Sequence, residues 1–239
     1  MRAVLCGANG AMGKLINGIL GAEIVGKVSI DGENNVPRTF GELGKVAADV
    51  VIDFSHHTAV ADVLAYAKAI GAAAVIGTTG HTPEEKAMIM AASEEIPVFF
   101  SGNMSLGIAV LCRPAKQAAA AFPDADIEIV EAHHIRKVDA PSGTALMLFN
   151  AIKEVRPDAV ANCGRAGEGR RTKEEIGIHA LRMGNVVGIH EIHIHTGSQS
   201  LTLKHESGSR AMLADGACDA ARFMVGRGKG LYNMESMLG

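Results

Sequence analysis

The stretch AVLCGANGAMG, residues 3–13, decides the architecture of the first half of the chain. Residues 3–6 are apolar and read as a short buried strand, and the glycines that follow permit a tight turn. We expect a helix behind this turn, over residues 13–20. Because the N–H groups of a first helical turn have no partners within the helix, this order of elements predicts a site for an anionic group.

The glycine spacing and a later acidic residue indicate that this anion is a dinucleotide. GANGAMG has the pattern G-x-x-G-x-x-G, a variant of the Rossmann fingerprint in which glycines let the backbone approach a pyrophosphate. A second strand is expected over residues 24–30, and Asp31 at its end is placed to accept hydrogen bonds from an adenosine ribose. For the glycines alone, the alternative is an ordinary glycine-rich turn.

The neighbours of Asp31 determine which nicotinamide cofactor is expected. Its carboxylate would repel a 2′-phosphate, and the following residues, GENNV, contain no Arg or Lys to bind one. We therefore expect NADH to be preferred and NADPH to be possible. Lys27 or Arg38 would weaken this preference if either side chain folded back towards the ribose.

Strands and helices alternate through residues 1–104. Further strands are expected over residues 50–54, 73–76 and 98–100, and further helices over residues 58–70 and 83–93. Strict alternation predicts a parallel sheet with right-handed crossovers. The segments GTTG (77–80) and SGNMSLG (101–107) then lie beyond the carboxyl ends of strands, where such sheets bind ligands. Each segment is either a plain turn or a surface for a nicotinamide ring.

The pattern changes after about residue 103. We expect a helix over 106–121, a strand over 127–134, an amphipathic helix over 144–155, at least two strands within 176–205, and a helical tail over 211–224. A second, sheet-rich unit is therefore inserted into the first. The expected domains are residues 1–104 with 211–239, and residues 105–210.

Composition excludes several classes of partner. The chain has 239 residues, a formal net charge of −3, few aromatic residues and no Trp, which argues against nucleic acid or an acidic membrane surface as a partner. No apolar run approaches the roughly 18 residues of a membrane helix, and no signal peptide is expected before the first strand. Cys6, Cys112, Cys163 and Cys218 are far apart in sequence, which favours reduced thiols in the cytoplasm over disulfides or structural zinc.

Residues 131–144, EAHHIRKVDAPSGT, combine groups that suit an anionic substrate in need of a proton. His133 and His134 are adjacent, so their side chains diverge in an extended backbone and should not share one role. Lys137 adds a fixed positive charge, and the free N–H groups of Ser142, Gly143 and Thr144 would bind a carboxylate or phosphate. The alternative is a solvated basic loop followed by a capped helix.

This stretch resembles the signature of the 4-hydroxy-tetrahydrodipicolinate reductase (dihydrodipicolinate reductase) family, E-x-H-H-x-x-K-x-D-x-P-S-G-T-A, at every fixed position. The resemblance runs from end to end. It includes GANGAMG, VVIDFS, VIGTTG, NMSLG, IGIHALRMGNVVGIHE, HESGSR and GLYNM. It implies an α/β protein with a Rossmann-type parallel-sheet dinucleotide-binding domain and an α+β substrate-binding and oligomerisation domain with a mixed open sheet.

The resemblance also implies roles for individual residues. His133 matches the proton donor, Lys137 a second donor or charge stabiliser, and His134 a substrate contact, while Ser142, Gly143 and Thr144 match a carboxylate clamp. The positions that match cofactor contacts are Gly7, Ala8, Asn9, Gly10, Ala11, Met12, Gly13, Asp31, Gly77, Thr78, Thr79, Ser101, Gly102, Asn103 and Met104. The implied reaction reduces 4-hydroxy-tetrahydrodipicolinate to tetrahydrodipicolinate, with hydride from nicotinamide C4 and a proton through His133. The implied assembly is a homotetramer formed through the second domain's sheet.

The chain departs from the family pattern at a few places. The segment between Asp31 and Val50 is short, Glu206 stands where a basic residue is common, and Gln199 stands where Glu is common. These departures lie outside the catalytic signature and affect local electrostatics rather than the type of reaction.

Three other functions compete with this interpretation. A metal-dependent enzyme would use His190, Glu191, His193 and His195, although no H-E-x-x-H pattern supports it and we expect no metal. A non-catalytic NAD-binding regulator would share the fold without needing a proton donor beside a carboxylate clamp. Another nicotinamide-dependent reductase, acting on a different aspartate-derived substrate, would share both.

Overall fold

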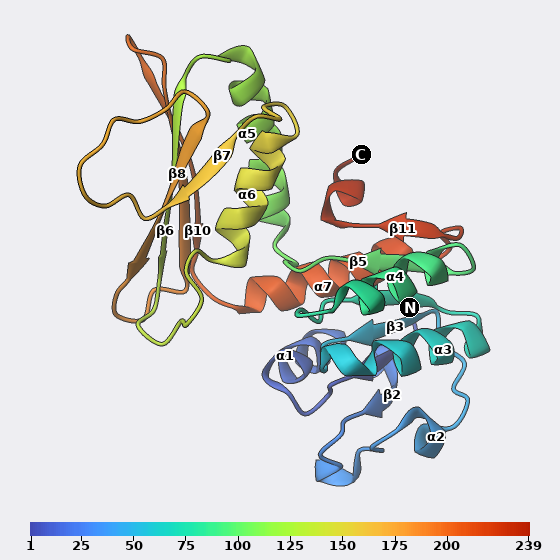
Figure 1. The fold of residues 1–239 in the computed structure, drawn as a ribbon. Helices are drawn as coiled ribbons and strands as arrows, with labels where there is room; N and C mark the ends of the chain where they lie inside the picture. Colours follow the sequence, from blue (N-terminus) through green and yellow to red (C-terminus); the bar gives the residue numbers. More distant parts are fainter. The chain divides into compact units, whose positions relative to one another are not determined.

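The computed structural model describes all residues, 1–239, and the chain divides into two compact units (Figure 1). Unit 1 comprises Met1–Ser105 and Ala211–Gly239, and unit 2 comprises Leu106–Arg210. No helix has both the length and the apolar character that a membrane span requires.

Unit 1 is built on a six-stranded sheet with the order β11-β5-β4-β3-β1-β2, in which all neighbouring strands are parallel. Its strands are β1 (Ala3–Cys6), β2 (Ile24–Val28), β3 (Val50–Asp53), β4 (Ala73–Ile76), β5 (Pro97–Phe100) and β11 (Gly230–Tyr232). Its helices are α1 (Ala11–Leu20), α2 (Phe40–Leu43), α3 (Val60–Ile70), α4 (Pro83–Ser93) and α7 (Ala211–Met224), with 3-10 turns at Gly21–Glu23, Glu33–Asn35, His57–Ala59 and Met234–Leu238. The predicted parallel sheet is confirmed.

Helices cover both faces of this sheet. Alternate strand residues such as Val51 and Ile76 pack with Val63 of α3 and Ile89 of α4 in one buried cluster. On the other face, the ring of Phe99 in β5 contacts that of Phe223 in α7. The carboxyl ends of the strands therefore form the open edge at which the ligand-binding turns lie.

Local sequence explains the sharpest boundary in unit 1. Helix α4 begins with Pro83, and the Thr82 hydroxyl accepts a hydrogen bond from Glu85 N while the Glu85 carboxylate accepts one from Thr82 N. This reciprocal capping satisfies two N–H groups that the first helical turn leaves open. The predicted cap and bounds of this helix are confirmed.

Three boundaries in unit 1 differ from the expectation by two residues. Helix α1 begins at Ala11, because Gly10 has an extended conformation and serves as its N-cap. Strand β2 ends at Val28, so Asp31 lies in a turn beyond the strand instead of at its end. Helix α3 begins only at Val60, because a 3-10 turn precedes it.

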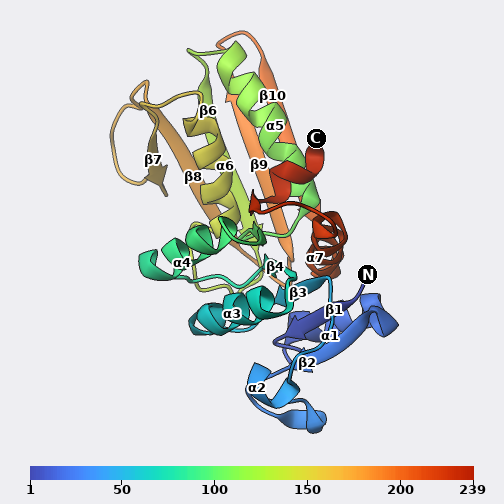
Figure 2. The same cartoon turned by 90° about the vertical axis from the view of Figure 1, so that its right-hand side faces the viewer.

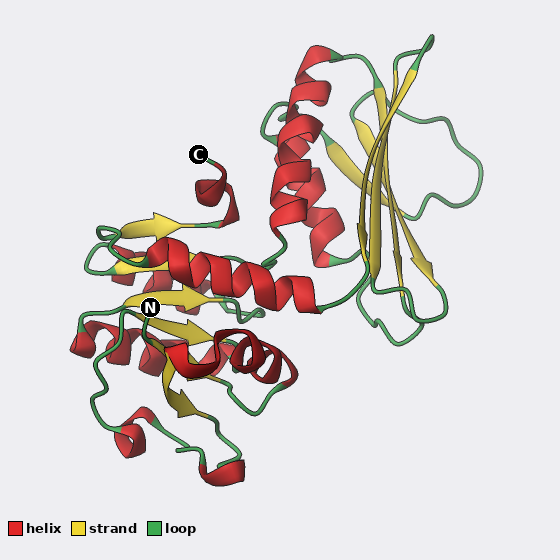
Figure 3. Cartoon of the chain, turned by 180° about the vertical axis from the view of Figure 1, so that it is seen from behind, coloured by secondary structure: helices red, strands yellow, loops and turns green.

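Unit 2 is a five-stranded mixed sheet with the order β10-β9-β6-β8-β7. Its strands are β6 (Asp126–His133), β7 (Val160–Cys163), β8 (Glu175–Arg182), β9 (Gly188–His195) and β10 (Ser200–Ser207), and its helices are α5 (Leu106–Ala121) and α6 (Gly143–Lys153). Strand β6 is parallel to β8 and antiparallel to β9. The expected mixed sheet is thereby confirmed. Both helices lie on one face of it (Figures 2 and 3).

The alternation of side chains along β6 positions the polar site of unit 2. Ile127 and Ile129 belong to the apolar core under α5 and α6. Glu131 and His133 continue the same face of the strand, because side chains two residues apart point in one direction. The last side chains on this face of β6 are therefore a buried carboxylate and a buried imidazole, which lie beyond the apolar core and next to the N-terminus of α6.

Candidate active site

The glycine turn of unit 1 leaves no room for side chains. Gly7 has φ +81°, and a Cβ there would lie 2.2 Å from the Phe54 carbonyl oxygen. A Cβ on Gly13, inside α1, would lie 2.2 Å from the Gly7 carbonyl oxygen. These contacts bring strand β1, the turn and helix α1 together as closely as a pyrophosphate-binding turn requires. The turn therefore fits a dinucleotide.

Asp31 is tied to this turn despite its position beyond β2. Its Oδ1 accepts hydrogen bonds from Asn9 Nδ2 at 2.6 Å and from Glu33 N at 3.0 Å. These bonds, that from Asn9 first, hold the pKa of Asp31 below its ordinary value. The exposed carboxylate is therefore ionised beside the glycine turn, where the ribose interpretation requires it.

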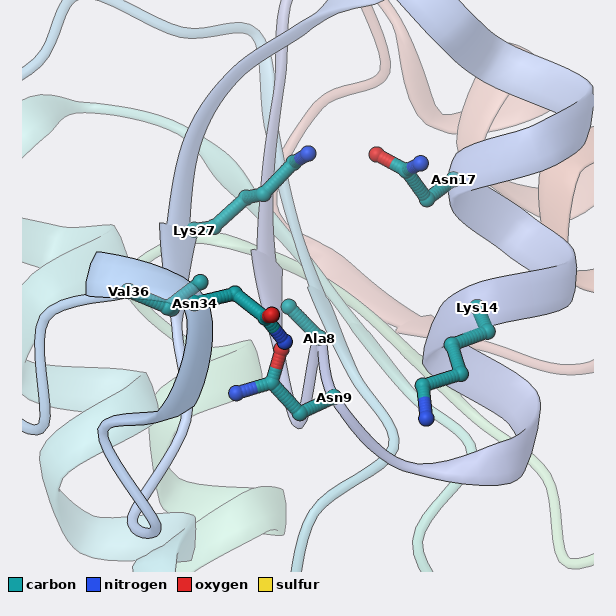
Figure 4. A pocket seen from close by; sticks show the side chains of 7 residues that line it. All are labelled: Ala8, Asn9, Lys14, Asn17, Lys27, Asn34 and Val36. Carbon is teal, nitrogen blue, oxygen red and sulfur yellow. The ribbon is translucent and has the colours of Figure 1, made fainter.

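A pocket of about 310 Å³ opens beside the same turn (Figure 4). It is lined by Ala8, Asn9, Lys14, Asn17, Lys27, Asn34 and Val36. Lys27 of β2 extends towards Asn17 of α1, and Lys14 of α1 lies at the same end of the pocket as Asn9 (Figure 4). Arg38 also lies near, since a Cβ on Gly32 would be 2.5 Å from its Nε. Lys14 therefore acts on the charge of Asp31, and Arg38 lies beside the neighbouring Gly32.

The two turns expected on the nicotinamide side lie together in unit 1. Ser101 N donates to the Ile76 carbonyl at 3.2 Å, and a Cβ on Gly102 would lie 3.9 Å from Thr79 Cγ2. Thr78 is buried, and its hydroxyl accepts a hydrogen bond from Ser55 N at 3.0 Å. The neighbouring positions differ in exposure: Gly77 and Asn103 are half-buried, and the Met104 side chain is buried. Contact between Met104 and a ligand would therefore involve its backbone.

His133 is held by a buried carboxylate in unit 2. Its Nδ1 lies 2.5 Å from Oε2 of Glu131, and the Glu131 side chain is 0% exposed. The same carboxylate receives both terminal nitrogens of Arg182 from β8, at 2.9 and 2.8 Å. Burial alone would raise the pKa of Glu131, but the hydrogen bonds from Arg182 and His133 outweigh it and hold that pKa below its ordinary value. The imidazole thus faces an ionised carboxylate.

The N-terminus of α6 is hydrogen-bonded to Glu131, which was not expected from the sequence. Ser142 is the N-cap, and its hydroxyl accepts a hydrogen bond from Ala145 N. Its own N–H donates to Oε1 of Glu131 at 3.0 Å. The expectation that all three N–H groups are free is therefore wrong for Ser142. Gly143, the next residue, is exposed at the helix start, and Thr144 is half-buried.

His134 and Lys137 lie in the loop that follows β6, and a hydrogen bond from Lys137 N to the His134 carbonyl closes the turn. Arg210 donates to Nε2 of His134 at 2.8 Å, and burial, with nearby positive charges, lowers the pKa of His134. Lys137 Nζ lies 2.9 Å from Oδ1 of Asp139. The two adjacent histidines have different partners, so their predicted divergence is confirmed.

The remaining histidines of β9 are divided between the two faces of the sheet. His190 faces the helices and is 4% exposed, with its Nε2 3.2 Å from Ser142 Oγ. His193 is on the other face, with Nε2 3.2 Å from Oε2 of Glu191, and His195 Nδ1 accepts a hydrogen bond from Gly197 N. No group of three or more His, Cys, Asp or Glu side chains is arranged to hold a metal ion.

Sequence reasoning missed the residues that hold His133 in place. The role of Glu131 could have been predicted from its spacing, since a Glu two residues before a histidine in one strand lies on the same face of that strand. No sequence pattern predicts the roles of Arg182 and His190. Arg182 meets Glu131, and His190 meets Ser142, through the pairing of β6 with β8 and β9.

Comparison with known proteins supports the resemblance to the dihydrodipicolinate reductase family over nearly the whole chain. Residues 1–104 match the family described as dihydrodipicolinate reductase, N-terminus, and residues 107–238 match its C-terminus. The 4-hydroxy-tetrahydrodipicolinate reductase of Clostridium novyi is 40% identical over 246 residues, covering 99% of this chain and 98% of that protein. The one from Caldanaerobacter subterraneus is 41% identical over 249 residues, covering 100% and 98%.

A solved structure of dihydrodipicolinate reductase from Paenisporosarcina sp. TG-14, with dipicolinate bound, is similar with a TM-score of 0.78 and 25% identity, covering 98% of this chain and 97% of that one. The chain therefore belongs to the dihydrodipicolinate reductase family, which are NAD(P)H-dependent oxidoreductases of lysine and diaminopimelate biosynthesis.

Proposed function

We propose that this chain reduces 4-hydroxy-tetrahydrodipicolinate to tetrahydrodipicolinate, with His133 as the source of the proton. The observation that carries the proposal is the arrangement of His133 on a buried, ionised Glu131, which also holds the first residue of α6. A proton donor beside a helix N-terminus suits a substrate with carboxylates on its ring.

The cofactor would be held by residues of unit 1. We assign the pyrophosphate to the turn from Gly7 to Gly13, the adenosine ribose to Asp31, and the nicotinamide to the segments Gly77–Thr79 and Ser101–Met104. A reduced nicotinamide bound there supplies the hydride of the reaction.

His133 would supply the proton, directly or through a water that it positions. The reduction consumes one hydride and one proton and releases one water from the hydroxylated substrate. Because Nδ1 of His133 faces Glu131, Nε2 is the atom assigned to this transfer. The adjacent carboxylate accepts the hydrogen bond from Nδ1 and so orients the ring for the transfer.

The carboxylates of the substrate would be met by positive charge and backbone N–H groups. We assign Lys137 and His134 to one side of the substrate, and the N-terminus of α6 at Gly143 and Thr144, shaped by Ser142, to a carboxylate. Lys137 would exchange Asp139, its partner at 2.9 Å, for the substrate. Such contacts gain strength as the site excludes water.

We further propose that NADH is preferred and NADPH is accepted. Asp31 is ionised, and it disfavours a 2′-phosphate by repulsion. Lys14, Lys27 and Arg38 lie around the same turn and reduce that repulsion. The Michaelis constants for the two cofactors measure the balance, and a value for NADPH equal to or below that for NADH would contradict the preference.

The uncovered face of the unit 2 sheet is the surface we propose for assembly into a homotetramer. Side chains there include His179, Glu191 and Lys204, which alternate along β8, β9 and β10 with residues of the apolar core. Both helices of unit 2 lie on the opposite face (Figure 3). Light scattering after gel filtration measures the mass of the assembly. A monomer at micromolar concentration would contradict the proposed tetramer. Four free cysteines support a reducing, cytoplasmic location.

The proposed activity is tested by an assay with the condensation product of pyruvate and aspartate semialdehyde. NADH oxidation that requires this product supports the proposal. A regulator would bind NADH without oxidising it, and a reductase of another aspartate-derived compound would oxidise NADH only with that compound. Activity that survives a strong chelator would exclude a catalytic metal.

A further inference from the structure

Glu131 is bound on all sides by donors that come from three different elements. Oε1 accepts hydrogen bonds from Ser142 N at 3.0 Å and from Arg182 at 2.8 Å. Oε2 accepts them from His133 Nδ1 at 2.5 Å and from the other terminal nitrogen of Arg182 at 2.9 Å. A carboxylate with no exposed surface is costly to bury, and here each oxygen has two donors to offset that cost.

The direction of these bonds determines the tautomer of His133. An ionised carboxylate can only accept, so the proton of a neutral His133 ring must be on Nδ1. Nε2 is then the atom with an open lone pair. It lies over Gly188 of β9, where an added Cβ would be 3.2 Å away, so residue 188 places no side chain against it.

The same carboxylate ties the imidazole to the helix that would receive the substrate. Ser142 is the N-cap of α6, and its N–H donates to Glu131 Oε1. A displacement of Glu131 would therefore move the proton donor and the start of α6 relative to each other. Errors of this kind matter because proton transfer requires donor and acceptor within hydrogen-bond reach.

Arg182 makes this arrangement rigid. Its guanidinium binds Glu131 with both terminal nitrogens and also donates to the Asp139 carbonyl at 2.6 Å, in the loop that contains Lys137. Two-point contact of this type fixes the plane of the carboxylate as well as its charge.

We propose that Glu131, held by Arg182, is a positioning residue of this reductase, which keeps His133 in the Nδ1–H tautomer and in register with the N-terminus of α6. This inference rests on the proposed function, because it assigns a role to Glu131 through the proton transfer by His133. Glu131 itself touches neither substrate nor cofactor in this account.

The comparison variant is Glu131→Gln, which keeps the shape of the side chain. Its amide must place a donor opposite a nitrogen of Arg182 whichever way it is turned, so the fixed acceptor is lost. We expect kcat to fall by at least about tenfold, because a general acid typically contributes a hundredfold or more. The Michaelis constant for NADH should stay within about twofold, since the cofactor site is in unit 1.

Two controls separate positioning from loss of stability. Ile129→Val removes a methyl group from the same face of β6, and it should lower the melting temperature while leaving kcat within about twofold. Glu154→Gln makes the same chemical change in the ion pair with Lys116 and should leave kcat unchanged. A Glu131→Gln protein that is folded and has wild-type kcat would overturn the proposal.

A measurement on the unmodified protein keeps the inference testable even if Glu131→Gln does not fold. Nitrogen-15 NMR of histidine-labelled protein distinguishes the Nδ1–H and Nε2–H tautomers. We expect His133, assigned by its loss in His133→Gln, to be Nδ1–H when neutral, and an Nε2–H tautomer would overturn the proposal. Because this readout needs no substrate, it is independent of whether the proposed reaction is correct.

The groups that face His133 must be considered when these spectra are recorded as a function of pH. They are Glu131 on its own strand, Arg182 on β8, His190 on β9 and His134 in the following loop, and His205 and Lys137 in turn act on His190. The spectra are therefore compared between wild type and His190→Gln, which should leave the His133 tautomer unchanged.

Discussion

His190 Nε2 lies 3.2 Å from Oγ of Ser142, a contact between residues 48 positions apart that joins strand β9 to the cap of helix α6. The Ser142 hydroxyl already accepts a hydrogen bond from Ala145 N, so its own proton is available to His190. A neutral ring can accept this proton at Nε2. Burial, with the nearby His133, lowers the pKa of His190 to about 4.

This low pKa predicts that the protein loses stability in mild acid. In the unfolded chain His190 binds a proton near pH 6.5, whereas in the folded chain it does so only near pH 4, so stability falls as pH drops through this window. The loss from this group is on the order of 3 kcal/mol. Urea titrations at several pH values should show a shallower pH dependence for His190→Gln than for wild type. Equal slopes would contradict the assignment.

His133→Gln should lower kcat by about a hundredfold or more, because it removes the proton donor and leaves the amide in its place. Its affinity for NADH, measured by fluorescence titration, should stay near that of wild type. The reason is that the residues assigned to the cofactor belong to unit 1 and His133 to unit 2. A large loss of NADH binding would mean that His133 has been given the wrong role.

Lys137→Ala should lower kcat and also raise the Michaelis constant for the dicarboxylate substrate. The ammonium group is assigned both to charge stabilisation and to holding a carboxylate. Asp139→Asn is the matched variant, since it removes the partner of Lys137 and keeps the cation. It should leave the Michaelis constant unchanged or lower. If Asp139→Asn impaired substrate binding as strongly as Lys137→Ala, the ion pair rather than the cation would be the functional unit.

Gly13→Ala and Gly18→Ala, both within helix α1, should have opposite effects. A Cβ on Gly13 would lie 2.2 Å from a backbone oxygen, whereas one on Gly18 would meet nothing within 4 Å. Gly13→Ala should cost about 1–3 kcal/mol of stability and weaken NADH binding, because the turn must shift. Gly18→Ala should stabilise by about 0.5–1 kcal/mol. Thermal unfolding with and without NADH compares them, and similar behaviour would refute the close-approach argument.

The sequence predicts the parts of this fold that depend on local pattern. The capped helix Pro83–Ser93 and the buried strand Ala73–Ile76 have the predicted bounds, because the capping residues and the apolar run are contiguous. The short strands Gly230–Tyr232 and Val160–Cys163 were not expected. Each lies at the edge of a sheet, where Gly230–Tyr232 pairs with the distant strand β5 and Val160–Cys163 pairs with the next strand, β8. Neither strand has a strong alternation of its own.

The candidate site shows the same division. His133, Lys137 and Ser142 belong to one contiguous motif, which sequence reasoning can identify. The partners of His133 and Ser142 cannot be found this way, since Arg182 is 51 positions from Glu131 and meets it only because β6 and β8 pair in parallel. The engagement of the Ser142 N–H by Glu131 follows from that packing and not from the helix-start pattern.

The most direct test of the central claim uses NADH in which both hydrogens at C4 of the nicotinamide are deuterium. The protein is incubated with this cofactor and the condensation product of pyruvate and aspartate semialdehyde, and the product is analysed by mass spectrometry. We predict tetrahydrodipicolinate that contains one deuterium and appears in step with NADH oxidation. Folded protein that binds NADH but transfers no deuterium to this substrate would contradict the account.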